Sequence, residues 1–380
     1  MTIFYNICSV LLYISLYLIA SVCLHFSAYA KDKKEKKLFY FLAAGLVIVF
    51  AALRNGVGTD YYNYSNEYKQ VGKISVGTYF KTGQYKTTTP ALFLIIKIAN
   101  VYRSERLFFL LSAAAVYVPA SVVLLKNKNN VSVFLSSFAF LTTMYTMGFN
   151  IMKQAAAVSF AFLALQYMLE KKPIVFFVNA FIAVCFHQTA VIILPFYLLN
   201  LRFFRDKDGF WKSKAMCVVP ICAVLLRICY PLVLKMLGER FSHYLSPVAS
   251  DLGNNYSFYL SAVILLGILV FSEKLKIKNQ NNVFYLMMML VGVIFESLGF
   301  VSGAIKRIMY YFSVFGVLII PQMTVICEPD KGGLLPDSTK KQITVQWYDL
   351  LEAGIVVYYA LLFFVEFYLF KHADIIPFKI

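Results

Sequence analysis

The chain has 380 residues, of which 60% are hydrophobic and 14% are charged. Because a soluble domain carries about a quarter charged residues, this composition excludes an ordinary soluble protein. The formal net charge is +17, but it does not indicate a nucleic-acid partner. The lysines and arginines form short clusters between apolar runs, as in the cytoplasmic loops of membrane proteins.

Apolar segments that are long enough to enter a bilayer recur along the whole chain. We expect an all-α, polytopic integral membrane protein with about twelve transmembrane helices, since each crossing takes about 20 apolar residues. The expected segments are 3–29, 38–53, 104–125, 131–149, 152–170, 173–186, 188–201, 214–237, 256–272, 282–302, 306–326 and 345–370. Lysines follow the first segment and no positive charge precedes it, so we expect a retained helix and no cleaved signal peptide.

The charged loops predict the orientation of the chain. The basic segment 31–37 is expected on the cytoplasmic side, and alternation of the spans then places both termini outside. The longest outer loops would be 54–103 and 238–255, and the longest inner loop 327–344. Segment 90–103 starts with a proline and is too short to cross a bilayer, so we expect a re-entrant or interfacial helix in the large outer loop. No internal repeat is visible, and residues 1–380 should form a single integral membrane domain.

The sequence contains no pattern that indicates a metal or a cofactor. The seven cysteines form no CxxC pair and lie mostly in apolar runs, where a reduced thiol packs as a small apolar group. A zinc site needs clustered cysteine and histidine ligands, and these are missing. No phosphate-binding P-loop occurs. We therefore expect no metal and no cofactor.

Unusual polar residues gather where the predicted helices meet the outer surface. They are Arg54 and Asp60; Asn150, Lys153 and Gln154; His187 and Gln188; Arg240 and His243; and Lys306 and Arg307. Each group by itself has a structural interpretation, such as a lysine reaching the interface or a hydrogen-bonded histidine. Charged groups at the membrane boundary are nevertheless functional candidates, and their shared side favours a binding site.

The chemistry of these residues suggests a phosphorylated substrate. Arginine binds phosphate oxygens with two parallel hydrogen bonds, and lysine acts as a point charge. The nearby rings of Tyr61 and Tyr64 suit a sugar, although an interfacial aromatic belt is an alternative. Because nucleotide-linked donors are cytoplasmic, a site on the outer side would take a lipid-linked donor.

Five stretches of the sequence resemble a known family. "RNGVGTDYYNY" (54–64) looks like the hallmark of EpsG-like proteins, the Wzy-type polymerases of exopolysaccharide and capsule synthesis. "NIMKQAAAVSFAFLAL" (150–165), "IAVCFHQTAVIILPFYLL" (182–199), "IKRIMYYF" (305–312) and "DIIPFKI" (374–380) agree, in the order of the family. Two positions depart from its pattern: Lys153 stands where arginine is usual, and Thr88 or Thr89 replaces an acidic residue before Pro90.

The resemblance implies a metal-independent glycosyltransferase in the cytoplasmic membrane of a bacterium, with its active site facing outward. It would join lipid-linked oligosaccharide units, and the growing chain would leave its undecaprenyl diphosphate. We assign the diphosphate to Arg54, Lys153 and Arg307, and the base to His187 or Asp60. Sugar or other substrate contacts are expected from Tyr61, Tyr64, Asn150, Gln154, Gln188, Arg240, His243, Lys306 and Tyr310. The expected partners are this substrate, membrane lipids, a flippase and a chain-length regulator.

Other functions stay open at this point. A flippase for the same lipid-linked units would also need cations, but it would show paired halves and charges along the spans. A membrane acyltransferase would use a histidine with cytoplasmic access, whereas His187 maps to the outer side and His25 has no acidic neighbour in the sequence. A ligase that transfers the chain to another acceptor is chemically close to a polymerase. The sugars, the linkage and the kind of polymer are not encoded in any visible pattern.

Overall fold

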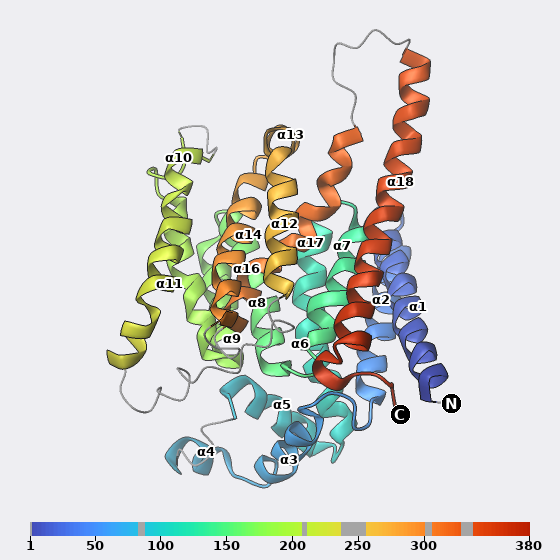
Figure 1. The fold of residues 1–380 in the computed structure, drawn as a ribbon. Helices are drawn as coiled ribbons and strands as arrows, with labels where there is room; N and C mark the ends of the chain where they lie inside the picture. The colour runs from blue at the N-terminus through green and yellow to red at the C-terminus, as the bar shows by residue number, and fades with distance from the viewer. Residues whose placement is uncertain (1, 83–87, 207–210, 237–255, 301–305, 328–336) are drawn as a thin grey trace. The chain divides into compact units, whose positions relative to one another are not determined.

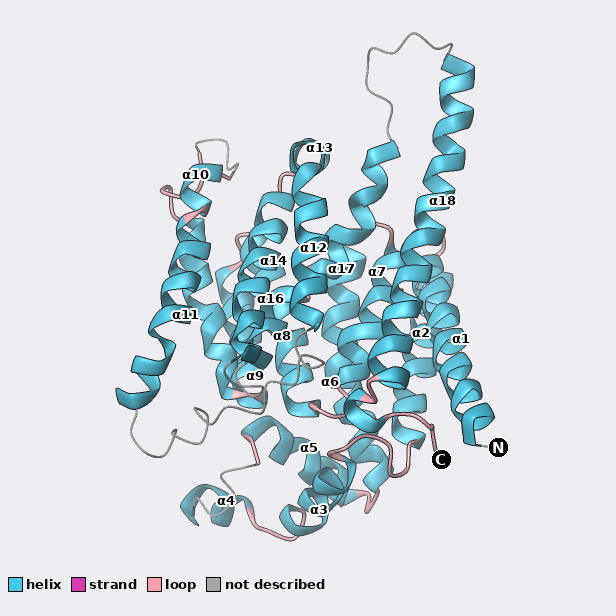
Figure 2. Cartoon of the chain, viewed as in Figure 1, coloured by secondary structure: helices cyan, strands magenta, loops and turns pink. Residues whose placement is uncertain are grey.

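A computed structural model describes residues 2–82, 88–206, 211–236, 256–300, 306–327 and 337–380. Helices make up most of these residues, and none of the described residues lies in a β-strand (Figure 2). The chain divides into two compact units. Unit 1 contains Met1–Leu194 and Leu351–Ile380, and unit 2 contains Pro195–Leu350.

Unit 1 is a bundle of long apolar helices. Its elements are α1 (Thr2–Tyr29), α2 (Lys33–Leu53), α6 (Glu105–Lys126), α7 (Val133–Phe140) with the π-helical turn Leu141–Tyr145, α8 (Met152–Leu169), α9 (Pro173–Phe186) and the end of α18 (Asp337–Phe363) with its π-helical continuation Phe364–Leu369. Helix α8 packs against α6 and α9, and α1 packs against α2 and α7. Small residues such as Ala155 and Ala161 are fully buried on α8 and allow this close packing.

The large loop predicted after the second helix folds into a layer of three short helices at one end of unit 1 (Figure 1). We call residues 54–82 and 88–103 the end layer. It contains α3 (Tyr61–Val71), α4 (Val76–Thr82) and α5 (Pro90–Val101), and α5 packs against α6 and α9. Buried aromatic and aliphatic side chains from α3, α5 and the start of α6 form its core. The interfacial or re-entrant character of α5 stays a prediction.

Unit 2 is built around α14 (Asn282–Glu296). Its other elements are α10 (Ser213–Met216), α11 (Val218–Met236), α12 (Tyr256–Val270), α13 (Ser272–Lys278), α16 (Tyr310–Ser313), α17 (Gly316–Ile319) and the 3-10 turns Ser297–Phe300, Arg307–Met309 and Ile320–Cys327. The 3-10 helix Gln188–Asn200 joins the two units in the chain. Asn282 and Gln322 exchange side-chain amide hydrogen bonds of 2.9 Å in each direction, which satisfies two buried polar groups.

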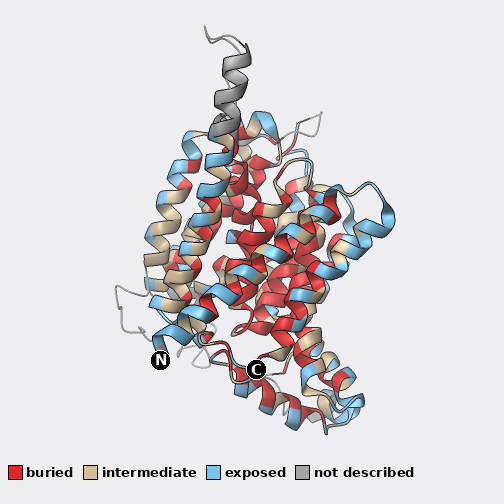
Figure 3. Cartoon of the chain, turned by 90° about the vertical axis from the view of Figure 1, so that its right-hand side faces the viewer, coloured by how far each residue is buried: buried red, intermediate tan, exposed pale blue. Residues whose placement is uncertain are grey.

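The structure confirms a helical, multi-pass membrane protein. Five helices among the described residues have the length and composition to cross a membrane, or up to six if the bent pair α12 and α13, which meet at 68°, makes one span. Each of the twelve expected segments contains helical residues, but several are short or broken, so the count of about twelve crossings stays a prediction. Large exposed apolar side chains such as Phe4, Ile19 and Phe41 line the helices near the N-terminus (Figure 3), as expected of a lipid-facing surface.

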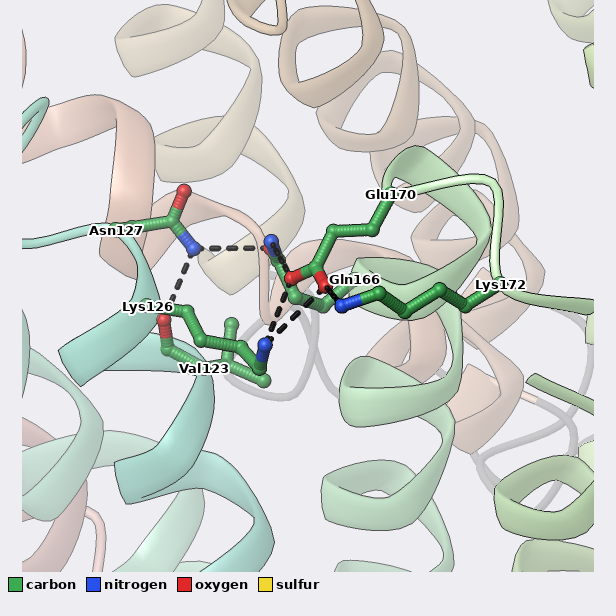
Figure 4. A network of polar contacts seen from close by, with 6 residues as sticks. All are labelled: Val123, Lys126, Asn127, Gln166, Glu170 and Lys172. Atoms are coloured by element: carbon green, nitrogen blue, oxygen red, sulfur yellow. Dashed lines mark hydrogen bonds and ion pairs between the residues drawn. The ribbon is translucent and has the colours of Figure 1, made fainter. Parts of the chain in front are cut away.

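A polar network joins α6 and α8 (Figure 4). Its residues lie at or just after the C-terminal ends of these two helices. Lys126 donates to the Glu170 carboxylate at 2.9 and 3.2 Å, and Lys172 donates at 2.8 Å. Gln166 donates to the same carboxylate at 3.2 Å and accepts from Asn127 at 2.9 Å. Burial alone raises the pKa of Glu170, but hydrogen bonds from Lys172, Lys126 and Gln166 outweigh it, so the pKa lies below its ordinary value.

The Glu170→Gln variant is expected to lose about 1 kcal/mol of stability at neutral pH, because a partly exposed ion pair contributes about that much. Since the pKa of Glu170 is lower in the folded state, the contribution is present above the unfolded pKa and disappears as the pH falls through the folded pKa. Melting temperatures of wild type and variant in detergent should therefore converge in acid. Glu35→Gln, at an exposed position of α2, is the control that should melt like wild type, and a Glu170→Gln gap that persists in acid would contradict the assignment.

Candidate functional site

The loop between α2 and α3, residues 54–60, turns sharply and lies against the start of α8. We refer to these residues as the loop. Gly56 and Gly58 have φ angles of +64° and +102°, which residues with a side chain rarely adopt. A Cβ atom at Gly58 would lie 2.8 Å from the carbonyl oxygen of Phe149. Gly58 of "RNGVGTDYYNY" therefore allows this backbone to approach the residues just before α8 closely.

The C-terminal tail, residues 371–380, runs beside this loop and bonds to it. Three backbone N–H groups of the loop donate to tail carbonyls: Asn55 to Lys379 at 2.9 Å, Gly58 to Asp374 at 3.1 Å, and Thr59 to Ala373 at 2.9 Å. Two stretches more than 300 residues apart in the sequence thus form one structural element.

The tail is in turn fixed to α1 and α2. The hydroxyl groups of Tyr5 and Tyr13 donate to the carbonyls of Phe378 and Ile375 at 3.0 and 3.2 Å. The ring of Phe378 stacks on Phe50 of α2, with centroids 4.1 Å apart. The segment "DIIPFKI" therefore contacts both α1 and the loop, and it stabilises the position of the loop.

Asn150 connects the loop to the residues just before α8. Its Oδ1 accepts hydrogen bonds from the Thr59 hydroxyl and from the Asp60 backbone N–H, the latter at 3.1 Å. The Asp60 carboxylate is half-buried and accepts from Asn63 at 3.2 Å. The sequence predicts Asp60 and Asn150 on the same side of the membrane, and the structure brings the two residues together.

Arg54 is buried without a carboxylate partner. It is 4% exposed, and its guanidinium carbon lies 5.0 Å from the Phe109 ring centroid and 4.5 Å from that of Phe149. Its Nη2 lies 4.0 Å from the sulfur of Met152, and its Nε has no hydrogen-bond partner. Among the described residues no carboxylate lies within 4.0 Å of it. Burial lowers the pKa of Arg54, with the Tyr13 hydroxyl as the largest opposing influence, but an arginine still carries its charge at neutral pH.

Arg54 also borders a small cavity of about 10 Å³ between α2, α6 and the start of α8. This volume holds about one water molecule. The lining includes Ala51, Ala113 and Gly148, so most of the wall is apolar. A buried, desolvated cation of this kind is a mark of a functional site.

Lys153 lies at the junction of α8 and α3. Its Nζ is 3.6 Å from Oε2 of Glu67 and 5.6 Å from the ring centroid of Tyr64. Both partners of this ion pair are largely buried, with 21% and 14% of their side chains exposed. Glu67 stands three residues after Tyr64 on α3, so the two side chains share a helix face.

The two tyrosines predicted to line a sugar path are both buried. Tyr61 is 8% exposed and stacks on Phe109 with centroids 4.8 Å apart, and Tyr64 is 6% exposed. Their rings support the core of the end layer, while Tyr62 between them is 65% exposed. Sugar binding by Tyr61 and Tyr64 stays a prediction.

His187 follows the last residue of α9, at the same end of unit 1 as the loop. Its Nδ1 shares a hydrogen bond of 2.7 Å with the Thr189 hydroxyl. The ring of Phe186 stacks on Phe160 of α8, which lies seven residues, or about 10 Å of helix rise, beyond Lys153. Gln188 beside His187 is exposed, and Gln154 on α8 is buried.

The remaining predicted residues belong to unit 2 or to segments that are not described. Lys306 donates to the Ser257 hydroxyl at 2.7 Å. Arg307 is exposed and begins a 3-10 turn, which Tyr310 continues as the start of α16. Arg240 and His243 lie in 237–255, outside the described residues. Within the described part of the chain, no group of three His, Cys, Asp or Glu side chains is placed to hold a metal ion.

The family of the chain follows from a comparison with models of protein families. The model of the EpsG family matches residues 37–379. The chain belongs to the EpsG family. Comparisons with curated proteins and with solved structures gave no match. The matched range includes the loop after α2, the start of α8 and all but the last residue of the tail. Membership of this family is consistent with an enzyme of polysaccharide biosynthesis.

The structure of this EpsG family protein adds one residue that the sequence did not single out. Glu67 forms the ion pair with Lys153, and its Oε1 is buried with no hydrogen-bond partner. The available signal was its spacing: an acid three residues after a tyrosine of the motif lies on the same face of a short helix. That signal is weak, because charged residues at such spacing usually face solvent.

Proposed function

We propose that this EpsG family protein is a polymerase that joins lipid-linked oligosaccharide repeat units at the outer face of a bacterial cytoplasmic membrane. The observation that carries the proposal is the environment of Arg54. A buried arginine with no carboxylate partner lies where the loop and the start of α8 meet. Because Arg54 is buried and no carboxylate balances its charge, this position favours the binding of an anionic ligand.

The proposed reaction transfers the growing chain from its carrier lipid to the next unit. A hydroxyl oxygen of the acceptor sugar attacks the anomeric carbon of the donor chain, and the bond from that carbon to the undecaprenyl diphosphate oxygen breaks. The bonding electron pair leaves with the diphosphate, and the hydroxyl proton passes to a base. Cations that meet the charge developing on the leaving group lower the barrier, which is the proposed task of Arg54 and Lys153.

The base is proposed to be Asp60 or His187. Asp60 is half-buried beside Asn150 in the loop, and His187 offers an imidazole, the side chain most often used for general acid–base catalysis. Tyr61 and Tyr64 are proposed to support the surface on which the sugar lies. A flippase would supply the lipid-linked units from the cytoplasmic side, and a chain-length regulator would act with the polymerase.

The Arg54→Ala variant is expected to lose polymer formation by about a hundredfold or more, the usual effect of removing one group that stabilises developing charge. The gene is deleted and then restored with wild type or with Arg54→Ala. The surface polysaccharide and the lipid-linked intermediates are sized in each strain. Single repeat units on lipid, with no long polymer, are expected for both the deletion and Arg54→Ala.

The matched control is Arg106→Ala, an exposed arginine on the first turn of α6, which should give wild-type polymer. Two results would contradict the proposal. Repeat units stranded on the cytoplasmic leaflet would indicate a flippase. Polymer of normal length that lacks only a substituent would indicate a transferase that modifies the finished chain.

A further inference from the structure

Two cationic side chains, Arg54 and Lys153, lie at the start of α8. The N-cap residue of this helix, Ile151, makes no side-chain capping hydrogen bond, and Lys153 lies in the first turn. The guanidinium of Arg54 reaches Met152, the first residue of the helix, and its buried Nε has no partner. Because a helix N-terminus itself attracts anions, a buried guanidinium whose Nε has no hydrogen-bond partner and a lysine at the same place favour a negatively charged ligand.

Glu67 supplies a negative charge here, but its contact is loose. The distance of 3.6 Å between Lys153 Nζ and Glu67 Oε2 exceeds the roughly 2.8 Å of a good charge-assisted hydrogen bond. The second oxygen, Oε1, is buried and has no hydrogen-bond partner. A buried ion pair that is only partly satisfied stabilises a fold poorly. The arrangement suits a counter-ion that is exchanged for another anion.

We propose that Glu67 is a displaceable counter-ion: its carboxylate holds Lys153 at the start of α8 until a phosphate group of the lipid diphosphate replaces it. The incoming group offers several charged oxygens to the side chains of Lys153 and Arg54. The carboxylate offers Lys153 one oxygen at 3.6 Å. This inference rests on the proposed function, because it takes a carrier-lipid diphosphate as the ligand.

The alternative is that the ion pair only fastens the end layer to α8. The two ideas predict opposite changes in ligand affinity when the charge of Glu67 is removed. If the ion pair is only a structural link, removing the charge of Glu67 loosens the site and weakens ligand binding. If Glu67 competes with the ligand, removing its charge strengthens binding, because the phosphate no longer has to displace a carboxylate.

The test measures binding of undecaprenyl diphosphate to the full-length protein in detergent. Glu67→Gln keeps the shape of the side chain and removes its charge, and it is expected to bind about tenfold more tightly than wild type, a change of about 1.4 kcal/mol. Glu105→Gln is the matched control, because Glu105 pairs with Lys69 at 3.8 Å in the same part of the unit; it should bind like wild type. Lys153→Met should bind at least tenfold more weakly. Undecaprenol, which lacks the phosphates, should show no gain with Glu67→Gln.

Equal or weaker binding by a Glu67→Gln protein that melts like wild type would overturn the proposal, as would an equal gain for undecaprenol. If Glu67→Gln melts at a lower temperature, Glu67→Asp decides: its shorter side chain lengthens the ion pair, and about threefold tighter binding is expected, while no gain overturns the proposal. Polymer formation from lipid-linked units is measured in parallel on wild type. Binding that follows the expected order without any polymer would contradict the polymerase and leave the role of Glu67 standing.

Discussion

The Gly58→Ala variant is expected to lose polymer formation almost completely. A side chain at φ +102° is strained by about 1–3 kcal/mol, and the new Cβ atom would lie 2.8 Å from the Phe149 carbonyl oxygen, which is backbone and cannot rotate away. The loop must therefore move off the start of α8. Because Thr59 and Asp60 bond to Asn150 just beyond this contact, the shift separates the residues that the motif brings together.

The measurement for Gly58→Ala is the length of the surface polymer, together with the melting temperature of the purified protein. Gly45→Ala on α2 is the control: a Cβ atom there meets nothing within 4 Å, and alanine favours a helix over glycine by about 1 kcal/mol. Gly45→Ala should match wild type in polymer and equal or exceed it in stability. Wild-type polymer from Gly58→Ala would show that the close approach of the loop to α8 is not needed for function.

The Phe378→Ala variant should give the largest loss of stability. Phe378 is 6% exposed, stacks on Phe50 and meets Tyr13 edge-to-face at 5.6 Å. Replacing a buried phenylalanine by alanine typically lowers the free energy of unfolding by about 3–5 kcal/mol. The backbone N–H of Phe378, which donates to Ser9 at 3.1 Å, remains, but the tail loses its apolar anchor between α1 and α2.

A loosened tail should also affect function, since its carbonyls accept hydrogen bonds from Asn55, Gly58 and Thr59. We expect at least a tenfold loss of polymer, equivalent to about 1.4 kcal/mol, and faster proteolysis of the C-terminus in the purified protein. Ile380→Ala, at a position that is 73% exposed in the same tail, is the control and should behave as wild type. A Phe378→Ala protein that melts lower but still makes wild-type polymer would limit the tail to a structural role.

These two predictions concern the same arrangement. The glycines let the loop approach α8, and the tail holds the loop there from the other side. Neither Gly58 nor Phe378 needs to touch a substrate for its replacement to reduce activity, because a displacement of about 1 Å at a reacting centre can lower a rate by about a hundredfold. Arg54, Lys153 and Glu67 all depend on that placement.

The class of the protein and the positions of most of its helices could be predicted from the sequence alone. Apolar composition and run length depend only on local sequence, and transfer of such runs out of water drives their insertion whatever their neighbours are. For the same reason the segments 3–29 and 38–53 correspond closely to α1 and α2. The loop motif carried the family resemblance, which the match over residues 37–379 confirmed.

The contacts between polar groups could not be predicted from the sequence, because they depend on how the helices pack. The burial of Arg54 between two phenylalanine rings, the pairing of Lys153 with Glu67 and the bonds from the tail to the loop join residues that are far apart in the chain. A periodic pattern shows which face of a helix is apolar, but not which partner covers it. Side-chain contacts of this kind follow from how helices pack, and the meeting of Arg54, Lys153 and Glu67 at the start of α8 becomes visible only when α2, α3 and α8 are assembled.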